Sequence, residues 1–379
     1  MQSLEKNGYT KKEIMDVLHS RRGPRKLRFR YDLLDKQNRF IKTLNSVLSG
    51  EVSMDSLADI KRKARFTIKD DGSINFFSDR IQPFVEIEIP TLRRHSEMIP
   101  KSWIAFPLGI FLLSSPTRKD QTNGVFRDVD AYGGLVILRD DKFDSTYVIP
   151  SGTKVYDAII ALLLSAGIAS YNIEFTNAVL QRDIEFEPGK EKLYAVNELL
   201  RQINYTPIYD DVNGIFTSAP YRSPAVKAID YTYRDDDASV TFQGMEEVLD
   251  LFEVPNKWVV VCSNPEQTPI GSTYINENMD SPSSTINRGR TIVDYREVSD
   301  IADQTTLDAY VQRIAFEASQ VYGKITFETA LMPMHDYGDI LEIDYSPLNI
   351  MGKYSETSWT MPLAIGGKMR HEVRKVVTI

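Results

Sequence analysis

A change of hydrophobic period at Asn204 constrains the fold of this chain more than any other feature of the sequence. Across Leu193–Ile203, apolar residues recur every three or four positions, which places them on one helical face. After Asn204 the period becomes two, and Asn213 with Gly214 supplies turn chemistry before a return strand. The segment Phe186–Phe216 is therefore predicted to be a helix packed on a hairpin, and the apolar face of that helix must be buried.

The length of the chain predicts two or three domains. Its 379 residues exceed what one hydrophobic core usually serves. Apolar residues make up 42% and charged residues 26%, which is typical of a soluble globular protein and not of a disordered or fibrous one. The formal net charge of -8 disfavours a general nucleic-acid binder and favours solubility or a surface that repels polyanions.

The single cysteine and the apolar runs bear on where the chain folds. Cys262 excludes an internal disulfide and follows the apolar run that begins at Trp258, so we interpret it as a buried hydrophobic residue in a reducing compartment. No secretory signal is expected, because the N-terminal lysines lack an apolar segment beside them. The longest apolar run, Ala158–Ala169, is shorter than the roughly 20 residues of a membrane-spanning helix. It predicts a core helix.

Four successive parts are predicted along the chain. Residues 1–23 form a basic helical N-terminal arm, in which Thr10 and Glu13 make a capping box. Residues 24–150 alternate apolar and polar side chains and form a first β-barrel domain. Residues 151–224 form a central α+β domain, and residues 225–379 form a second β-rich domain with one long helix.

Helices and turns within these parts have expected ends. Thr153 is expected to cap a helix that Gly167 ends. Gly323 is expected to end the long helix, and Asn123 with Gly124 to turn the chain between two strands. The expected helices span about Lys154–Ala166, Lys190–Asn204 and Thr306–Tyr322.

Residues 262–290 are dense in Ser, Asn, Pro and Thr. The stretch is too long for a simple connection, so it is predicted to be functional, mobile or both. We interpret it as an intersubunit loop.

The order of several segments carries a family resemblance that no single segment would. These segments are Pro107–Leu113, Asp130–Leu135, Thr153–Gly167, Lys190–Tyr205 and, after the helix that ends at Tyr322 and Gly323, Met334–Tyr345. The ordered set resembles the phage tail hub family, which comprises the baseplate hub of contractile tails, the tail-associated hub of long-tailed phages and related secretion-spike proteins. The resemblance covers most of the chain from about Leu27 onward.

This resemblance implies an α+β fold with two small β-barrels like those of tail-tube proteins, a central α+β domain and the N-terminal helical arm. It implies a homotrimeric ring that joins the tail tube to the tail tip in the virion, after folding and assembly in the host cytoplasm. The implied partners are a distal tail or tail-tube protein, the tape measure protein and a tip or fibre protein, with DNA only as passing cargo. The chain ends at Ile379 without the lysozyme, peptidase or fibre-like extension of many members, which favours a separate tip protein and no enzyme activity.

Motifs for catalysis are absent from the sequence. It holds no Gly-rich phosphate loop, no G-x-S-x-G, no H-E-x-x-H and no C-x-x-C, so we expect no enzyme, no cofactor and no metal. His335 with Asp336 and Asp339 has the residue types of a cation site, but the same residues suit a polar turn, which we favour. The run 235–237 of three aspartates lacks the spacing of a calcium loop and predicts a solvated turn.

Two other functions remain open. Glu185 and Glu187 point to one face of a β-type run, and a cell-wall hydrolase at the tail tip would use a carboxylate pair. A host-receptor or polysaccharide-binding tail protein would use the Ser- and Asn-rich stretch 262–290.

A basic cluster stands out against the acidic chain. We interpret it as a docking surface for an acidic neighbour in the tail, with a solvated face and direct DNA contact as alternatives. The acidic run Asp230–Asp237 on a neighbouring subunit is a candidate counterpart, or part of a lumen wall that repels DNA. The cluster consists of Arg21, Arg22, Arg25, Lys26, Arg28, Arg30, Lys61, Arg62 and Lys63.

Overall fold

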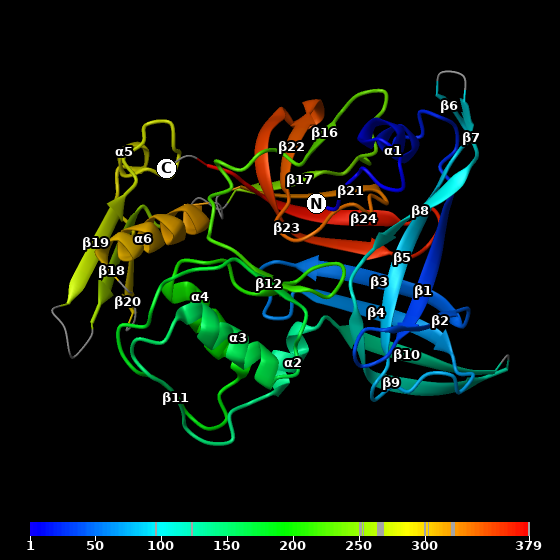
Figure 1. Cartoon of the computed structure of the whole chain (residues 1–379). Coiled ribbons are helices and arrows are strands. Elements are labelled where there is room, and N and C mark those ends of the chain that lie inside the picture. Colours follow the sequence, from blue (N-terminus) through cyan, green and yellow to red (C-terminus); the bar gives the residue numbers. More distant parts are fainter. Residues whose placement is uncertain are drawn as a thin grey trace.

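Most strands of the chain join one large sheet (Figure 1). The computed structural model describes residues 1–94, 97–122, 124–249, 252, 254–263, 269–298, 301, 303–319 and 323–377. The 14 strands of this sheet are β1 (Leu27–Leu34), β2 (Phe40–Leu44), β3 (Val47–Asp55), β4 (Arg62–Lys69), β5 (Arg80–Ile89), β8 (Ser102–Pro107), β9 (Phe111–Gln121), β10 (Gly124–Tyr132), β16 (Tyr231–Arg234), β17 (Glu246–Leu249), β21 (Gly323–Ala330), β22 (Ile340–Tyr345), β23 (Ile350–Pro362) and β24 (Lys368–Lys375).

Helices and four smaller sheets surround it. The helices are α1 (Lys11–Leu18), α2 (Leu135–Asp140), α3 (Val155–Ser165), α4 (Lys192–Gln202), α5 (Thr285–Arg288) and α6 (Gln304–Ser319), with a short 3₁₀ turn at Ser346–Leu348. The smaller sheets pair β6 (Leu92–Arg94) with β7 (Glu97–Ile99), β11 (Tyr147–Ile149) with β13 (Ile184–Phe186), β12 (Tyr171–Ile173) and β14 (Tyr209–Asp210) with β15 (Phe216–Ser218), and β19 (Ile270–Ile275) and β20 (Val293–Val298) with β18 (Lys257–Cys262).

Strand β23 joins the two halves of the large sheet. Its 13 residues pair with β22 at one end, with β24 along the middle and with β3 at the other end. Trp359 lies opposite both His371 of β24 and Met54 of β3. Figure 1 shows the red strands of the C-terminal half continuing into the blue strands of the N-terminal half.

The mixed α+β class predicted from the sequence is confirmed, but the two small barrels are not. The strand order runs β17-β21-β24-β23-β3-β4-β10-β9-β5-β1-β2, and no closed barrel forms among the residues that the structure describes. An edge of β3 that could close the N-terminal strands on themselves is paired with β23 over Glu51–Asp55 instead. The observed arrangement is one continuous sheet.

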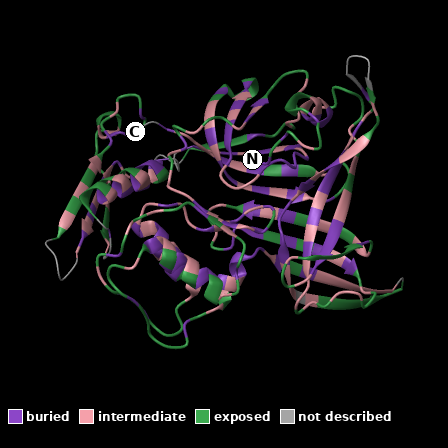
Figure 2. Cartoon of the chain, viewed as in Figure 1, coloured by how far each residue is buried: buried purple, intermediate pink, exposed green. Residues whose placement is uncertain are grey.

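Three hydrophobic cores follow from this arrangement, as the buried faces in Figure 2 show. The first lies on the large sheet, where Phe66 and Trp359 are fully buried. The second lies between α2, α3 and α4, which pack on one another. The third is small and lies where α6 covers β18 and β19 around Trp258.

The N-terminal segment packs into the first core and does not project as an arm. The predicted capping box of α1 is confirmed, with Thr10 and Glu13 bonding each other's backbone. Ile14 is fully buried, and Val17 and Leu18 beside it are nearly so. The predicted basic arm at residues 1–23 is helical in α1, and the apolar face of this helix is buried in the large core.

The predicted helix and hairpin in the centre of the chain are confirmed. Helix α4 buries Leu193, Val196 and Leu199, and β14 pairs with β15 across a turn in which Gly214 has a φ of 73°. Helix α3 ends before Gly167, which has a φ of 78°. Its predicted cap is wrong, because Lys154 is the N-cap and no side chain bonds there.

The long C-terminal helix is confirmed as α6, which is described from Gln304 to Ser319. Gly323 begins β21, and Tyr322 at the predicted end of the helix lies outside the described residues, as does Asn123 of the predicted turn. The stretch 262–290 is not one long loop. It contains β19, paired with β18, and α5, capped by Ser284. The prediction of a loop is wrong because alternate residues of β19 face α6.

Candidate functional site

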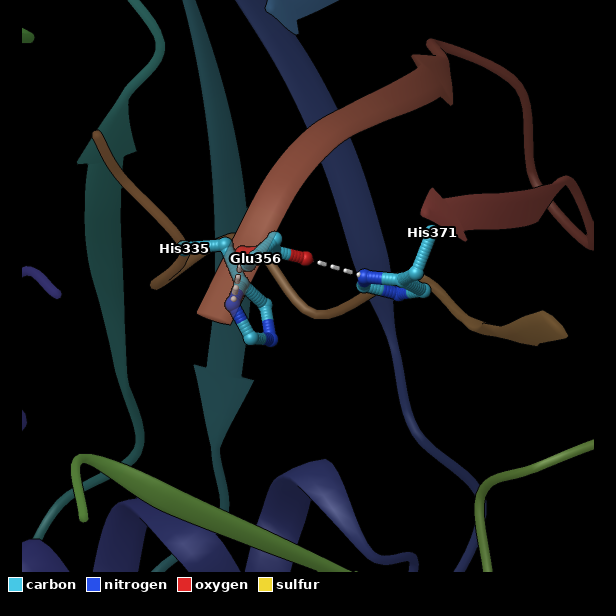
Figure 3. A group of neighbouring side chains, drawn as sticks. All are labelled: His335, Glu356 and His371. Atoms are coloured by element: carbon cyan, nitrogen blue, oxygen red, sulfur yellow. Dashed lines mark hydrogen bonds and ion pairs between the residues drawn. The ribbon is translucent and has the colours of Figure 1, made fainter. Parts of the chain in front are cut away.

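Three polar side chains with ligand chemistry meet inside the large core: His335, Glu356 and His371 (Figure 3). One nitrogen or oxygen atom from each lies within 4.8 Å of the others, and the three side chains are fully buried. His335 comes from the turn before β22, Glu356 from β23 and His371 from β24. Buried groups of this kind require partners, because an unpaired charge in a core is costly. We call these three residues the HEH cluster.

Glu356 lies on the inward face of β23, two residues after the buried Tyr354, and a β-bulge follows it. The pairing register between β23 and β24 shifts between Glu356 and Ser358, and both Glu356 and Thr357 are buried where a regular strand would alternate. The inward face of β24 is regular, and His371 lies on it between the buried Met369 and Val373. The carboxylate of Glu356 and the imidazole of His371 therefore face the same core from neighbouring strands.

Glu356 lies between the two imidazoles. Its Oε1 atom is 2.6 Å from Nδ1 of His371, and its Oε2 atom is 2.9 Å from Nδ1 of His335. The same nitrogen of His335 is hydrogen-bonded to Oδ2 of Asp339 at 3.1 Å. Oε2 of Glu356 is buried and accepts no hydrogen bond of acceptable geometry. One carboxylate oxygen of the HEH cluster is therefore left unsatisfied.

Hydroxyl groups hold the outer nitrogen of each ring. The Tyr233 hydroxyl is 2.7 Å from Nε2 of His335, and the Thr329 hydroxyl is 2.9 Å from Nε2 of His371. Phe327 also stacks on the His371 ring, with 4.8 Å between centroids. These contacts fix the orientation of both rings, so that each directs Nδ1 toward Glu356.

Charge in the HEH cluster is unevenly distributed. Burial by itself lowers the pKa of His335, but Glu356 and Asp339 outweigh burial and raise that pKa to about 9. Burial by itself raises the pKa of Glu356, but the two histidines outweigh it and lower that pKa to about 2. The pKa of His371 is lowered, with burial as the main cause. A fixed carboxylate thus faces two nonequivalent imidazoles.

A cleft borders the HEH cluster on the outer side of β23. It has a volume of about 560 Å³, and its wall includes Arg201 of α4, Arg313 of α6 and Tyr337 of the turn before β22. Arg313 donates a hydrogen bond of 2.8 Å to the backbone oxygen of Tyr205, which ties α6 to the central helices. The cleft therefore lies where the three cores of the chain meet.

Comparison with known proteins gives results by structure only. No family model matches the sequence, and no curated protein matches it. The tail protein from Neisseria meningitidis MC58 is similar, with a TM-score of 0.64 at 11% identity over 92% of this chain and 97% of that one. The prophage MuSo2 tail protein from Shewanella oneidensis matches with a TM-score of 0.60 at 9% identity over 91% and 98%.

A third match is the prophage tail protein gp18 from Listeria monocytogenes EGD-e, with a TM-score of 0.55 at 13% identity over 91% of this chain and 94% of that one. The chain has the fold of these tail proteins, here called the hub fold. The resemblance that was inferred from the order of segments is therefore confirmed at the level of the fold. At these identities the likeness concerns the hub fold and does not by itself assign a role to any side chain.

In this hub fold, two residues of the predicted basic cluster are buried and the others lie at or near the surface. Lys61 and Arg62 are buried, and Arg62 is paired with Asp336 inside the chain. Arg62 also donates hydrogen bonds to the backbone oxygens of Asp210 and Leu108, at 3.0 and 3.2 Å. The prediction that these two residues face a partner is therefore wrong, because β4 turns Arg62 to the same inward face as Phe66.

The other seven basic residues lie at or near the surface, and several pair with acids of their own chain. Arg22 pairs with Asp16, and Lys26 with Glu88. The interface role of the seven stays a prediction. They are Arg21, Arg22, Arg25, Lys26, Arg28, Arg30 and Lys63.

The other residues that the sequence singled out as possible functional residues lie at separate places in the hub fold. Glu185 and Glu187 are exposed, as expected for the outer side of β13 and its end, and residues 235–237 form an exposed turn. Cys262 is buried at the end of β18, as predicted. No described helix has both the length and the apolar character needed to cross a membrane.

Sequence reasoning found only one member of the HEH cluster. His335 and Asp339 do share a polar turn, as predicted, but Asp336 points instead to Arg62. Glu356 and His371 were missed. A usable signal exists for His371, because in the alternating β24 it occupies a position on the apolar face. A comparable signal exists for Glu356, which in β23 alternates in phase with the buried Tyr354.

Proposed function

We propose that this protein is a structural component of a bacteriophage tail, a hub that works by shape and without catalytic turnover. The observation that carries the proposal is the match to the Neisseria meningitidis tail protein, with a TM-score of 0.64 over 92% of this chain and 97% of that one. Nearly whole-length agreement in both directions means that the shared fold includes all three cores and not a single common module. Since fold does not fix function, the role needs its own test.

The assembled form that we propose is a homotrimeric ring that joins the tail tube to the tail tip. The ring frames the channel through which the tape measure protein and DNA pass, and its neighbours are a tube or distal tail protein and a tip or fibre protein. This form is the one that the resemblance to the phage tail hub family implies. The proposed location is the virion tail, after assembly in the host cytoplasm.

The domain limits that we propose for the hub remain residues 1–23, 24–150, 151–224 and 225–379.

The exposed part of the basic cluster is proposed to dock an acidic neighbour in the tail. Replacement of Arg21 and Arg22 by Glu tests this: the variant is expected to sediment with tail particles less than the parent protein does. Equal sedimentation would remove the proposed docking role.

Light scattering of the purified protein across a concentration series tests the ring. A hub that assembles by itself gives about three chain masses of 43.2 kDa each, and class averages in electron microscopy then show three-fold rings. A monomer at every concentration, also after addition of a tail-tube protein, would contradict the trimeric hub.

A further inference from the structure

We propose that His335, Glu356 and His371 form a structural site for a divalent transition-metal ion, with Zn²⁺ as the ion that suits the donors best. The site lies wholly inside one chain and is independent of the ring. It goes beyond the tail role, because the fold likeness assigns no metal to this chain.

The donor set is the first argument. Two imidazole nitrogens and a carboxylate oxygen lie within 4.8 Å of one another. Nitrogen and oxygen donors of this kind are the ligands of Zn²⁺ and neighbouring divalent ions in proteins. None of the three side chains is exposed, which favours a structural site.

The outer contacts of the two rings are the second argument. Histidines that bind metals are usually held at the other ring nitrogen by a polar partner, which sets the tautomer and the ring direction. Tyr233 and Thr329 occupy these positions on His335 and His371. Both rings therefore direct their Nδ1 atoms inward toward the same carboxylate (Figure 3).

The unsatisfied oxygen of Glu356 is the third, independent argument. Oε2 of Glu356 has no hydrogen bond, and it lies 2.9 Å from Nδ1 of His335, a nitrogen that is hydrogen-bonded to Asp339. A buried carboxylate oxygen without a donor is costly. A cation between Glu356 and the two rings would satisfy this oxygen.

The charge of the surroundings agrees with a cation. Asp339 is paired through its other oxygen with the Met1 amino group, and the Glu356 carboxylate lies between the two imidazoles. A bound metal ion would take the place of the protons that the two rings direct toward this carboxylate, and it would connect the turn before β22 with β23 and β24. Since β23 also pairs with β3, the ion would fasten the strand that joins the two sheet halves.

Metal analysis of the purified full chain tests the site. Inductively coupled plasma mass spectrometry is expected to give about one Zn²⁺ per chain. Removal with dipicolinate is expected to lower the thermal midpoint, and added Zn²⁺ to restore it. Glu356→Gln keeps the size of the side chain but removes its charge, so we expect at least a tenfold fall in bound metal.

A matched control is Glu86→Gln, which changes another buried glutamate, one that pairs with Arg28 and Arg30 far along the chain. It is expected to keep the parent metal content. If Glu356→Gln does not fold, Thr329→Val, which removes only the hydroxyl at Nε2 of His371, is expected to lower Zn²⁺ affinity by about tenfold. Two results together would overturn the site: the parent protein holds no stoichiometric metal, and its thermal midpoint changes with neither chelator nor Zn²⁺. The three side chains would then be held together by hydrogen bonds alone. Equal metal loss in the Glu86 variant would overturn it too.

Discussion

Arg62 shows how position on a strand outweighs residue type. In the sequence it belongs to a run of basic residues, and such runs are usually solvated. In the structure it lies on the inward face of β4 together with Phe66, and its guanidinium contacts Asp336 and two backbone oxygens. A planar group with several donors can satisfy three acceptors at once, which a lysine could not do in the same geometry.

Replacement of Arg62 by Met is expected to lower the free energy of unfolding by about 3–5 kcal/mol, because it leaves buried acceptors and Asp336 without their donor. Urea unfolding monitored by fluorescence measures the change. Arg65→Met on the same strand is the control, since Arg65 is exposed and its pair with Asp130 is expected to contribute at most about 1 kcal/mol. Similar losses for both variants would show that Arg62 is not a core residue in solution.

At the scale of elements, the capping box of α1 and the pairing of β23 with β24 differ in range. The capping box at Thr10 starts α1 and is complete within four residues. Glu356 lies on the apolar face of β23 with Tyr354, but it meets His371 only because β23 pairs with β24. This difference explains why the sequence predicted α1 with its cap but not the contact between Glu356 and His371.

Helix α1 is expected to be an integral part of the large core. Ile14→Ala should lower the free energy of unfolding by about 2–5 kcal/mol, because a fully buried side chain leaves a cavity. Lys12→Ala on the exposed side of the same helix should change it by less than about 0.5 kcal/mol. Chemical unfolding of both variants decides the matter. An Ile14 variant with a nearly unchanged free energy of unfolding would show that α1 is not part of the large core in solution.

At the scale of the whole molecule, cores of unequal size share one chain. The large core extends across both halves of the main sheet, whereas the core around Trp258 holds only α6 and its three-stranded sheet. Small cores bury less apolar surface per residue and open more readily. The α6 unit is therefore expected to be the least stable of the three.

Hydrogen–deuterium exchange of the native protein measures this difference. Backbone amides of β18 and β19 are expected to exchange at least tenfold faster than those of β23 and β24, because local opening costs less free energy where the core is small. The fair comparison uses the amides of β18, which has a paired strand on both sides as β24 has, whereas β19 is an edge strand. Equal protection would mean that the three cores unfold as one unit.

The sequence by itself determined the local elements of this protein. The periods of α3, α4 and α6, the capping box of α1, the hairpin after Asn204 and the burial of Cys262 all follow from neighbours within a few residues, and the ordered set of segments led to the hub fold. The tertiary structure alone decided the joining of β23 to β3, the burial of Arg62 and the meeting of His335, Glu356 and His371. These contacts join residues far apart in the chain, and periodicity fixes which face of a strand is apolar but not which strand covers it.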